Sequence, residues 1–226
     1  MQKVNDRLYR MAFLSPFPTN IYFVVEPDGL TVIDSGYDWT VPLILRAAGR
    51  LGKPVRRVLL THAHPDHAGG AMRLARTCGA EILAHAADVP FLTGQRSMAD
   101  EAGGWLCRTV LGGLRVLGLL DTPPCRDVTP LSEGDMVGRL QVLFTPGHTP
   151  GSASFWAEAD EAIFCGDNAS ATFFFLHLGV PWFSLDMGRL YQSVGRYREL
   201  PARHLLCGHG PVWHGDLSAA MGRLLA

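Results

Sequence analysis

The sequence predicts an α+β protein, a four-layer αβ/βα sandwich in which two mixed β-sheets pack face to face under outer helices. Two successive blocks of short apolar segments, each followed by amphipathic segments, predict this arrangement. Hydrophobic residues make up 47% of the 226 residues and charged residues 18%, which is typical of a globular chain with a sizeable core. Because no repeat or low-complexity tract divides the chain, we expect one domain over residues 1–226.

The first block alternates strands with turns before its helices begin. Strands are expected at residues 7–12, 20–25, 30–33, 57–61 and 81–84. Pro27-Asp28-Gly29 forms the turn between the second and third of these strands. Helices are expected at residues 39–51, which Gly52 ends, at residues 71–76, and from Ala86 onward.

The second block repeats the order of strands followed by helices. Strands are expected at residues 141–145, 153–156, 162–165 and 204–207, and helices at residues 186–200 and 217–225. Two segments read as insertions over the active site, at about residues 91–133 and 171–185. The first carries a helix near residues 100–120 and then a proline-rich stretch. The second is dense in aromatic residues.

Composition excludes several classes of function. The net charge of −1 and the lack of a dense Lys/Arg run argue against nucleic acid or an anionic membrane as partner. The longest apolar run, residues 110–120, contains Arg115 and is too short to span a bilayer, and the amino terminus lacks the apolar core of a secretory signal. Five scattered cysteines without a C-x-x-C pair are typical of reduced thiols. We expect a cytoplasmic protein with a small-molecule substrate, as a monomer or a homodimer.

The stretch from His62 to His67 is the most informative in the chain. The sequence His-Ala-His-Pro-Asp-His places three imidazoles and one carboxylate in six residues. Imidazole nitrogen and carboxylate oxygen are ligands that zinc and related divalent metals accept. The stretch falls between an expected strand and an expected helix, where a rigid scaffold can hold several ligands at one point. A polar loop of hydrogen-bonding histidines is the alternative, and the density of ligand-type residues favours a metal site.

Three later motifs share one pattern, a short apolar strand that ends in glycine and a ligand-type residue. They deliver His148 after Pro146-Gly147, Asp167 after Gly166, and His209 after Gly208. Glycine at a strand end lets the backbone turn tightly and approach another group. Strand ends are also where residues distant in sequence can converge.

Together these motifs resemble those of the metallo-β-lactamase-fold hydrolase superfamily. The resemblance rests on Thr61-His62-Ala63-His64-Pro65-Asp66-His67, Pro146-Gly147-His148-Thr149-Pro150-Gly151-Ser152, Gly166-Asp167, Gly208-His209-Gly210 and the early motif Val32-Ile33-Asp34-Ser35-Gly36. It covers nearly the whole chain. It implies the metallo-β-lactamase fold, and a dinuclear centre with Zn²⁺ as the expected ion and Fe or Mn as alternatives.

The resemblance also implies a role for each ligand-type residue. His62, His64 and His148 would hold the first metal, and Asp66, His67 and His209 the second. Asp167 would bridge the two ions, and a hydroxide held between them would act as nucleophile. Asp66 would also act in catalysis by orienting that hydroxide. Asp34 fits a supporting role behind the ligands, with a turn-capping aspartate as the alternative.

The motifs define a metal centre more closely than a substrate. The bridging Asp167 argues against true zinc β-lactamases, and glyoxalase II-like thioesterases share every ligand. Lactonases of this fold place a tyrosine where this chain has Ser170, which weakens that assignment without excluding it. We expect cleavage of an ester, lactone or thioester. A mononuclear-iron persulfide dioxygenase using His62, His148 and Asp167 is the main alternative, and a phosphodiesterase is a further one.

Aromatic residues between Asp167 and the expected helix at residue 186 are candidates for a substrate pocket. They are Phe173, Phe174, Trp182 and Phe183, to which we add Ser170. Such aromatic density is equally typical of a buried core. As an apolar wall beside the metal, these residues would favour a substrate with an apolar acyl part.

Overall fold

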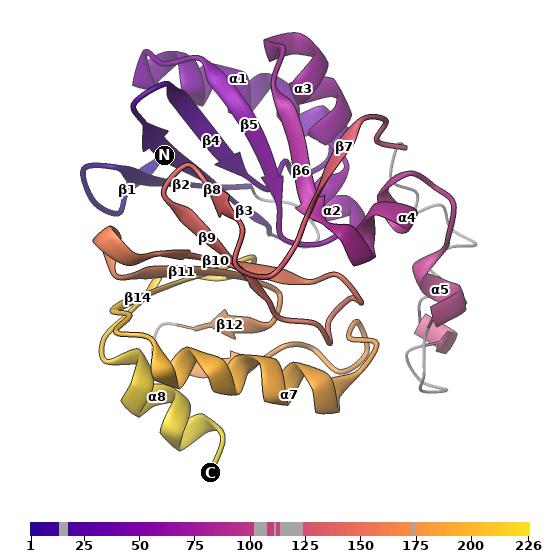
Figure 1. Ribbon diagram of the computed structural model, residues 1–226, viewed down its shortest axis with the longest axis vertical. Coiled ribbons are helices and arrows are strands. Elements are labelled where there is room, and N and C mark those ends of the chain that lie inside the picture. Colours follow the sequence, from indigo (N-terminus) through magenta and orange to yellow (C-terminus); the bar gives the residue numbers. More distant parts are fainter. Residues whose placement is uncertain (14–17, 102–107, 111, 114–123, 173–174) are drawn as a thin grey trace.

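The computed structural model describes residues 1–13, 18–101, 108–110, 112–113, 124–172 and 175–226. Two mixed sheets form the centre of the molecule, and helices cover their outer faces (Figure 1). This arrangement confirms the predicted α+β class and its two face-to-face sheets. Within the described residues, no helix is both long and apolar enough to cross a membrane.

The first sheet has seven strands in sequence order. They are β1 (Gln2–Lys3), β2 (Leu8–Ala12), β3 (Asn20–Glu26), β4 (Gly29–Ile33), β5 (Val55–Leu60), β6 (Glu81–His85) and β7 (Val128–Leu131). Pairing is antiparallel up to β4 and parallel from β4 to β7. The parallel half brings the carboxyl ends of β4, β5 and β6 to one edge.

The second sheet has six strands in the order β15-β14-β11-β10-β9-β8. Their bounds are β8 (Met136–Val137), β9 (Leu140–Phe144), β10 (Ala153–Ala157), β11 (Ala162–Gly166), β14 (His204–Cys207) and β15 (Trp213–His214). Strands β9 and β11 each run antiparallel to β10, and β14 runs parallel to β11. The carboxyl ends of β9, β11 and β14 therefore share one edge.

Strand alternation divides the core into three layers of side chains. In β3, Tyr22 packs between the two sheets, whereas Phe23 packs against the helices of the first sheet. In β11, Phe164 joins the layer between the sheets, whereas Ile163 and Cys165 face the helices of the second sheet. Both faces of each sheet are buried, and this explains why these strands read as continuous apolar runs.

Helices close the two outer faces (Figure 1). The first sheet is covered by α1 (Val41–Leu51) and α3 (Ala71–Cys78), and the second by α7 (Met187–Gly195) and α8 (Leu217–Leu224). Helix α1 follows η1 (Asp38–Thr40) and ends where Gly52 takes a left-handed conformation. Asp186 and Asp216 cap α7 and α8 by accepting hydrogen bonds from Arg189 N and Ala219 N, both at 2.9 Å.

Several boundaries differ from the prediction. The helix expected to reach residue 200 leaves the α conformation after Gly195 and continues as η4 (Arg196–Glu199). The segment from Ala86 forms η2 (Ala86–Asp88) and α4 (Val89–Leu92), and α5 (Met98–Glu101) follows. The expected insertion at residues 91–133 contains β7, which pairs with β6 and belongs to the sheet. Most of the helix expected near residues 100–120 lies outside the described residues.

A third, two-stranded sheet was not expected. It pairs β12 (Ala169–Ala171) with β13 (Leu176–Leu178) and lies directly after Asp167. Its strands have three residues each, too few for alternation to be recognised in a sequence. The aromatic segment at residues 171–185 is therefore partly a hairpin built on the second sheet.

Candidate metal centre

The seven ligand-type residues come from loops at the adjoining edges of the two sheets. His62 follows β5, His148 lies between β9 and β10, Asp167 follows β11, and His209 follows β14. Backbone hydrogen bonds join these edges, since Ala153 N donates to Thr61 O at 2.9 Å and Asn20 N donates to Gly208 O at 2.8 Å. The convergence expected from four separate motifs is thus a consequence of strand direction in both sheets.

The stretch from His62 to His67 is not wholly a loop. Pro65–Ala68 forms the one-turn helix α2, with Pro65 at its first position, where a fixed φ favours helix and a missing N–H costs nothing. His62 and His64 precede this turn, whereas Asp66 and His67 lie on it. Helix α2 therefore directs Asp66 and His67 toward a different point from the two histidines that precede it.

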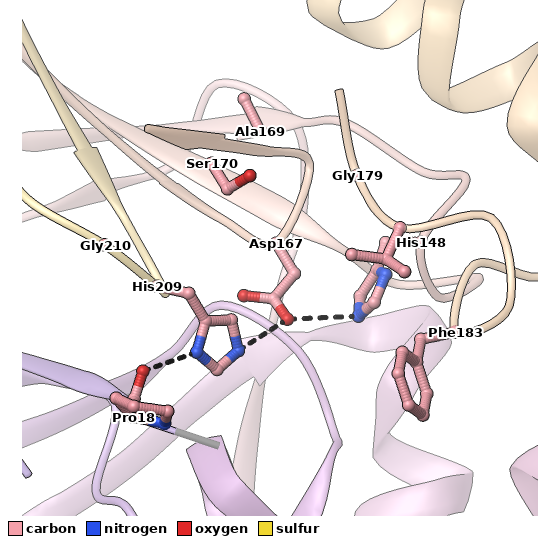
Figure 2. Close-up of a pocket in the computed structure, with 10 residues that line it drawn as sticks. Pro18, His148, Asp167, Ala169, Ser170, Gly179, Phe183, His209 and Gly210 are labelled. Atoms are coloured by element: carbon pink, nitrogen blue, oxygen red, sulfur yellow. Dashed lines mark hydrogen bonds and ion pairs between the residues drawn. The ribbon is translucent and has the colours of Figure 1, made fainter. Parts of the chain in front are cut away.

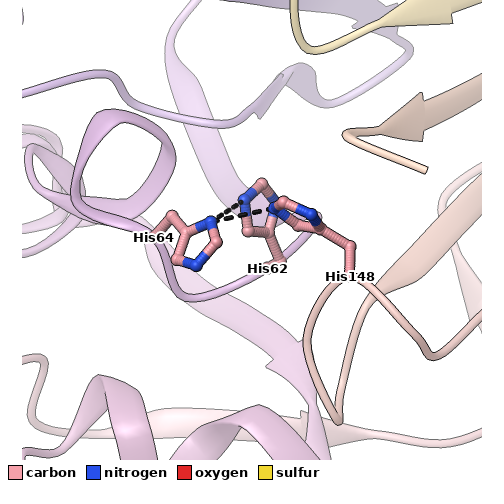
Figure 3. A group of neighbouring side chains, drawn as sticks. All are labelled: His62, His64 and His148. Atoms are coloured by element: carbon pink, nitrogen blue, oxygen red, sulfur yellow. Dashed lines mark hydrogen bonds between the residues drawn. The ribbon is translucent and has the colours of Figure 1, made fainter. Parts of the chain in front are cut away.

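Three buried histidines form the first group of ligand-type atoms (Figure 3). His64 Nδ1 lies 3.1 Å from His62 Nε2 and 2.9 Å from His148 Nε2. A tetrahedral zinc with Zn–N bonds of about 2.0–2.1 Å would hold its nitrogens about 3.3 Å apart. The three nitrogens therefore converge at nearly the spacing that one bound ion requires.

The second group consists of Asp66, His67 and His209. His67 Nε2 lies 3.4 Å from His209 Nε2, and Asp66 Oδ2 lies 3.5 Å from each of these nitrogens. The three atoms again face a common point. Asp66 Oδ2 also accepts a hydrogen bond from Thr19 Oγ1 at 3.2 Å, which fixes the carboxylate.

Asp167 lies between the two groups (Figure 2). Its Oδ2 is 3.1 Å from His209 Nε2 and 3.6 Å from His148 Nε2, and its Oδ1 is 3.3 Å from His67 Nε2. One carboxylate thus reaches histidines of both groups, as a bridging ligand must. Asp167 Oδ1 is buried and has no hydrogen-bond partner among the described residues. An orphaned carboxylate oxygen facing imidazole nitrogens fits a metal ligand.

Groups behind the ligands orient the imidazole rings. Asp34 accepts hydrogen bonds from Thr61 N at 2.8 Å and from the Thr61 hydroxyl, and lies 2.8 Å from His67 Nδ1. His209 Nδ1 lies 2.7 Å from Pro18 O, and His148 Nδ1 lies 3.1 Å from Ser184 Oγ. In each of these rings, the bonded nitrogen is Nδ1, so Nε2 is left to face the centre. Asp34 thus lies behind His67, on the side of the ring opposite the Nε2 atom.

The two groups of ligand-type residues differ in their protonation when no metal is bound. Burial, reinforced by neighbouring imidazoles, lowers the pKa of His62 well below its usual value and that of His148 to about 3. Burial also lowers the pKa of His209, but the Asp167 carboxylate outweighs that effect and raises it to about 9. The first group is therefore neutral, the form in which imidazole binds a metal. The second group pairs imidazolium with the carboxylates of Asp66 and Asp167.

The sequence analysis missed two residues that connect the loops of the candidate ligands. Asp88 is fully buried and accepts hydrogen bonds from the loops that carry His62 and His148. Asn168 donates to Thr145 O at 2.9 Å, which ties the Asp167 loop to the His148 loop. Neither residue stands in a recognisable motif. A lone Asp or Asn near a predicted turn is indistinguishable from a surface polar residue without tertiary contacts.

Five of the described histidines and cysteines outside the motifs make contacts away from the candidate centre. His204 and His214 lie 2.8 Å apart on paired strands, measured between their Nδ1 atoms, and His85 stacks on Phe144. Cys165 and Cys207 pack in the layer between the second sheet and its helices. Strand alternation thus turns both thiols away from the face between the sheets, although each lies two positions before a ligand-type residue.

A cavity of about 370 Å³ opens beside the candidate centre (Figure 2). Its lining residues are Pro18, His148, Asp167, Ala169, Ser170, Gly179, Val180, Phe183, His209 and Gly210. Ser170 and Phe183 therefore lie where the sequence analysis expected pocket residues. Trp182 is 49% exposed and is not among the lining residues. Phe173 and Phe174 lie outside the described residues.

Comparison with known proteins identifies the family. Residues 14–209 match the model of the metallo-beta-lactamase superfamily, so the chain belongs to that superfamily and the predicted resemblance is confirmed. Hydrolases are found among its relatives. The uncharacterized protein YobT of Bacillus subtilis is 34% identical, over 69% of this chain and 64% of that protein.

A second relative carries an activity in its name. The hydroxyacylglutathione hydrolase of Rhodospirillum rubrum is 33% identical over 74% of this chain, and the match spans about half, 52%, of that protein. Among solved structures, TTHA1623 in a di-iron-bound form superposes with a TM-score of 0.73 at 28% identity, covering 94% of this chain and 98% of that one.

Proposed function

We propose that this protein is a metal-dependent hydrolase that cleaves an ester, lactone or thioester with the help of two divalent ions, most simply Zn²⁺. One observation carries the proposal: Asp167 lies within 3.6 Å of imidazole nitrogens from two separate groups of ligand-type residues. A carboxylate shared between two nitrogen-rich groups is the arrangement that a dinuclear site needs.

The chemistry of the donor set fits such ions. The first group offers three imidazoles and the second offers two imidazoles and the carboxylate of Asp66. With Asp167 shared, each ion would have four protein ligands or fewer, and zinc sites keep a position for water or substrate by expanding their coordination. Two divalent ions bound there supply a nucleophilic hydroxide at neutral pH and polarise the carbonyl to be attacked.

The neighbouring residues determine where the reacting atoms can lie. The His67–Asp34 contact and the His209–Pro18 contact fix two rings, and the Thr19 hydroxyl fixes Asp66. Asp66 would bind an ion through one carboxylate oxygen, and the same carboxylate would orient the attacking hydroxide. Electrostatic groups held in advance cost no reorganisation in the transition state.

The residues that line the cavity favour a substrate whose acyl group is uncharged and apolar. Apart from the ligand-type residues, its lining side chains are uncharged, and Val180 and Phe183 form its apolar wall. An acyl group placed against Phe183 would present its carbonyl carbon to the edge where His148, Asp167 and His209 meet. Hydrolysis of acyl thioesters is supported by the relative named as a hydroxyacylglutathione hydrolase.

The proposal is tested on full-length protein whose metal content has been quantified. Acyl thioesters, acyl esters, lactones and phosphodiesters are offered to the same preparation with either Zn²⁺, Fe²⁺ or Mn²⁺. We expect two ions per chain and hydrolysis of at least one of the first three classes, which a chelator abolishes and added metal restores. One iron per chain with oxygen uptake on glutathione persulfide would replace the proposal with the dioxygenase alternative.

A further inference from the structure

Asp88 lies at the end of η2 and touches the loops that carry His62, His64 and His148. Its Oδ2 accepts hydrogen bonds from Ala63 N at 2.9 Å and from Thr149 Oγ1 at 2.8 Å. Its Oδ1 accepts a hydrogen bond from Gly151 N at 2.7 Å. The residue is 0% exposed. One buried carboxylate therefore joins a loop of the first sheet to a loop of the second.

The three partners are placed next to the candidate ligands. Ala63 lies between His62 and His64 in the chain, and Thr149 directly follows His148. The contact with the second loop is close, because a Cβ at Gly151 would lie 2.3 Å from Asp88 N. Only glycine allows η2 and this loop to approach so closely.

Asp34 and Asp88 have different partners. Asp34 contacts Thr61 and His67, which both belong to the segment that follows β5, with His67 on α2. Asp88 bonds across the two sheets, at the point where the first group of histidines is assembled from separate loops. Burial raises the pKa of Asp88 to about 6, so keeping this carboxylate ionised costs stability.

We infer that Asp88 is a positioning residue that sets the spacing between His62, His64 and His148, so that their nitrogens close around one ion. The inference rests on the proposed function, because it assumes that an ion binds there. Imidazole positions follow the backbone, and Asp88 accepts a backbone hydrogen bond from each of the two loops, from Ala63 N and from Gly151 N. Loss of its bonds lets the two loops separate, which weakens the first site and leaves Asp66, His67 and His209 in place.

Two substitutions remove the bonds without removing volume. Asp88→Asn keeps the shape but replaces an acceptor oxygen by an amide NH₂ group, which faces at least one N–H or O–H donor. Thr149→Val removes one bond to Asp88, and Thr149→Ser keeps the hydroxyl. Asp160→Asn is a matched control. Asp160 is another buried carboxylate, and it accepts hydrogen bonds from Asn5 and Arg7. It lies just before β11, whereas Asp167 lies just after that strand.

The measurement is a Zn²⁺ titration of chelator-stripped, full-length protein against a competing chelator, with Co²⁺ absorption as a second readout of each site. We expect the wild type to bind two ions. Asp88→Asn and Thr149→Val should weaken one of the two by about ten- to a hundredfold, as loss of outer support to metal ligands typically does. Thr149→Ser and Asp160→Asn should keep both affinities within about threefold, a scatter of well under 1 kcal/mol.

Folded Asp88→Asn protein that binds both ions like the wild type overturns the inference. If that variant does not fold, folded Thr149→Val protein with unchanged affinities overturns it in the same way. Wild-type protein that binds no ion overturns the proposed function itself. The two failures are therefore distinguishable.

Discussion

Gly208 lies directly against Asp167, so that a Cβ at position 208 would be 2.1 Å from Asp167 Oδ1. The same Cβ would be 2.6 Å from His67 Cε1. Both distances are far shorter than a van der Waals contact, so any larger residue must displace two proposed ligands. The glycine between Cys207 and His209 is therefore required by the candidate centre rather than by its own backbone conformation.

Gly208→Ala is expected to lower kcat/KM by about a hundredfold, because misplacing reacting groups by about 1 Å costs that much. Steady-state kinetics on the best substrate checks this. Gly49→Ala is the control, since a Cβ at this position on α1 would meet nothing within 4 Å. Equal activity of Gly208→Ala and wild type would show that Asp167 is not a ligand in this position.

Asp66→Asn is expected to lower kcat by at least about a hundredfold, because a neutral amide binds a cation and orients a metal-held hydroxide less well than a carboxylate does. The fold should remain, since asparagine has nearly the same shape as aspartate and its side-chain oxygen can still accept the hydrogen bond from Thr19. Kinetics and circular dichroism on the same sample measure both effects. Retained hydrolysis would mean that the water is oriented by another group.

The pKa of His209, raised to about 9, predicts a pH dependence of stability in chelator-treated protein. A raised pKa means that the folded state holds its proton more tightly than the unfolded state, whose histidine has a pKa of about 6.5. The resulting stabilisation is complete below about pH 6.5 and is lost as the pH rises through 9, amounting to up to about 3 kcal/mol.

Urea unfolding between pH 6 and 10 measures this loss. His209→Gln should show a shallower decline over the same range, because its side chain does not titrate. An identical decline in the two proteins would contradict the assignment of the proton to His209.

Phe183→Ala is expected to lower kcat/KM for long acyl chains by about tenfold and to leave short chains nearly unchanged, since the lost apolar contact is worth about 1–3 kcal/mol. Trp182→Ala is the matched control. Trp182 is the aromatic residue next to Phe183, but its side chain is half exposed and does not line the cavity. Rates on a series of acyl esters or thioesters of increasing length check both. Equal chain-length profiles would place the acyl group elsewhere.

Patterns within the sequence were sufficient to predict most helices and strands and to single out the ligand-type residues. Strands such as β3 and β11 contain continuous apolar runs, because both faces of these strands are buried. The four motifs lie at the ends of strands, and it was their combination and order along the chain, not any one of them alone, that indicated the superfamily. Short elements could not be predicted, because α2, β12 and β13 have three or four residues each and depend on contacts outside their own span.

The sequence by itself determined the donor types, their order along the chain and the superfamily. Only the tertiary structure decided which donors face one another, how the loops are held and which of the aromatic residues reach the cavity. Phe183 lines it while Trp182, its neighbour, is half exposed, because the path of the backbone and not composition decides where a side chain points. Asp88 carries no sequence signal, since its three hydrogen-bond partners lie 25 and about 60 positions away in the chain.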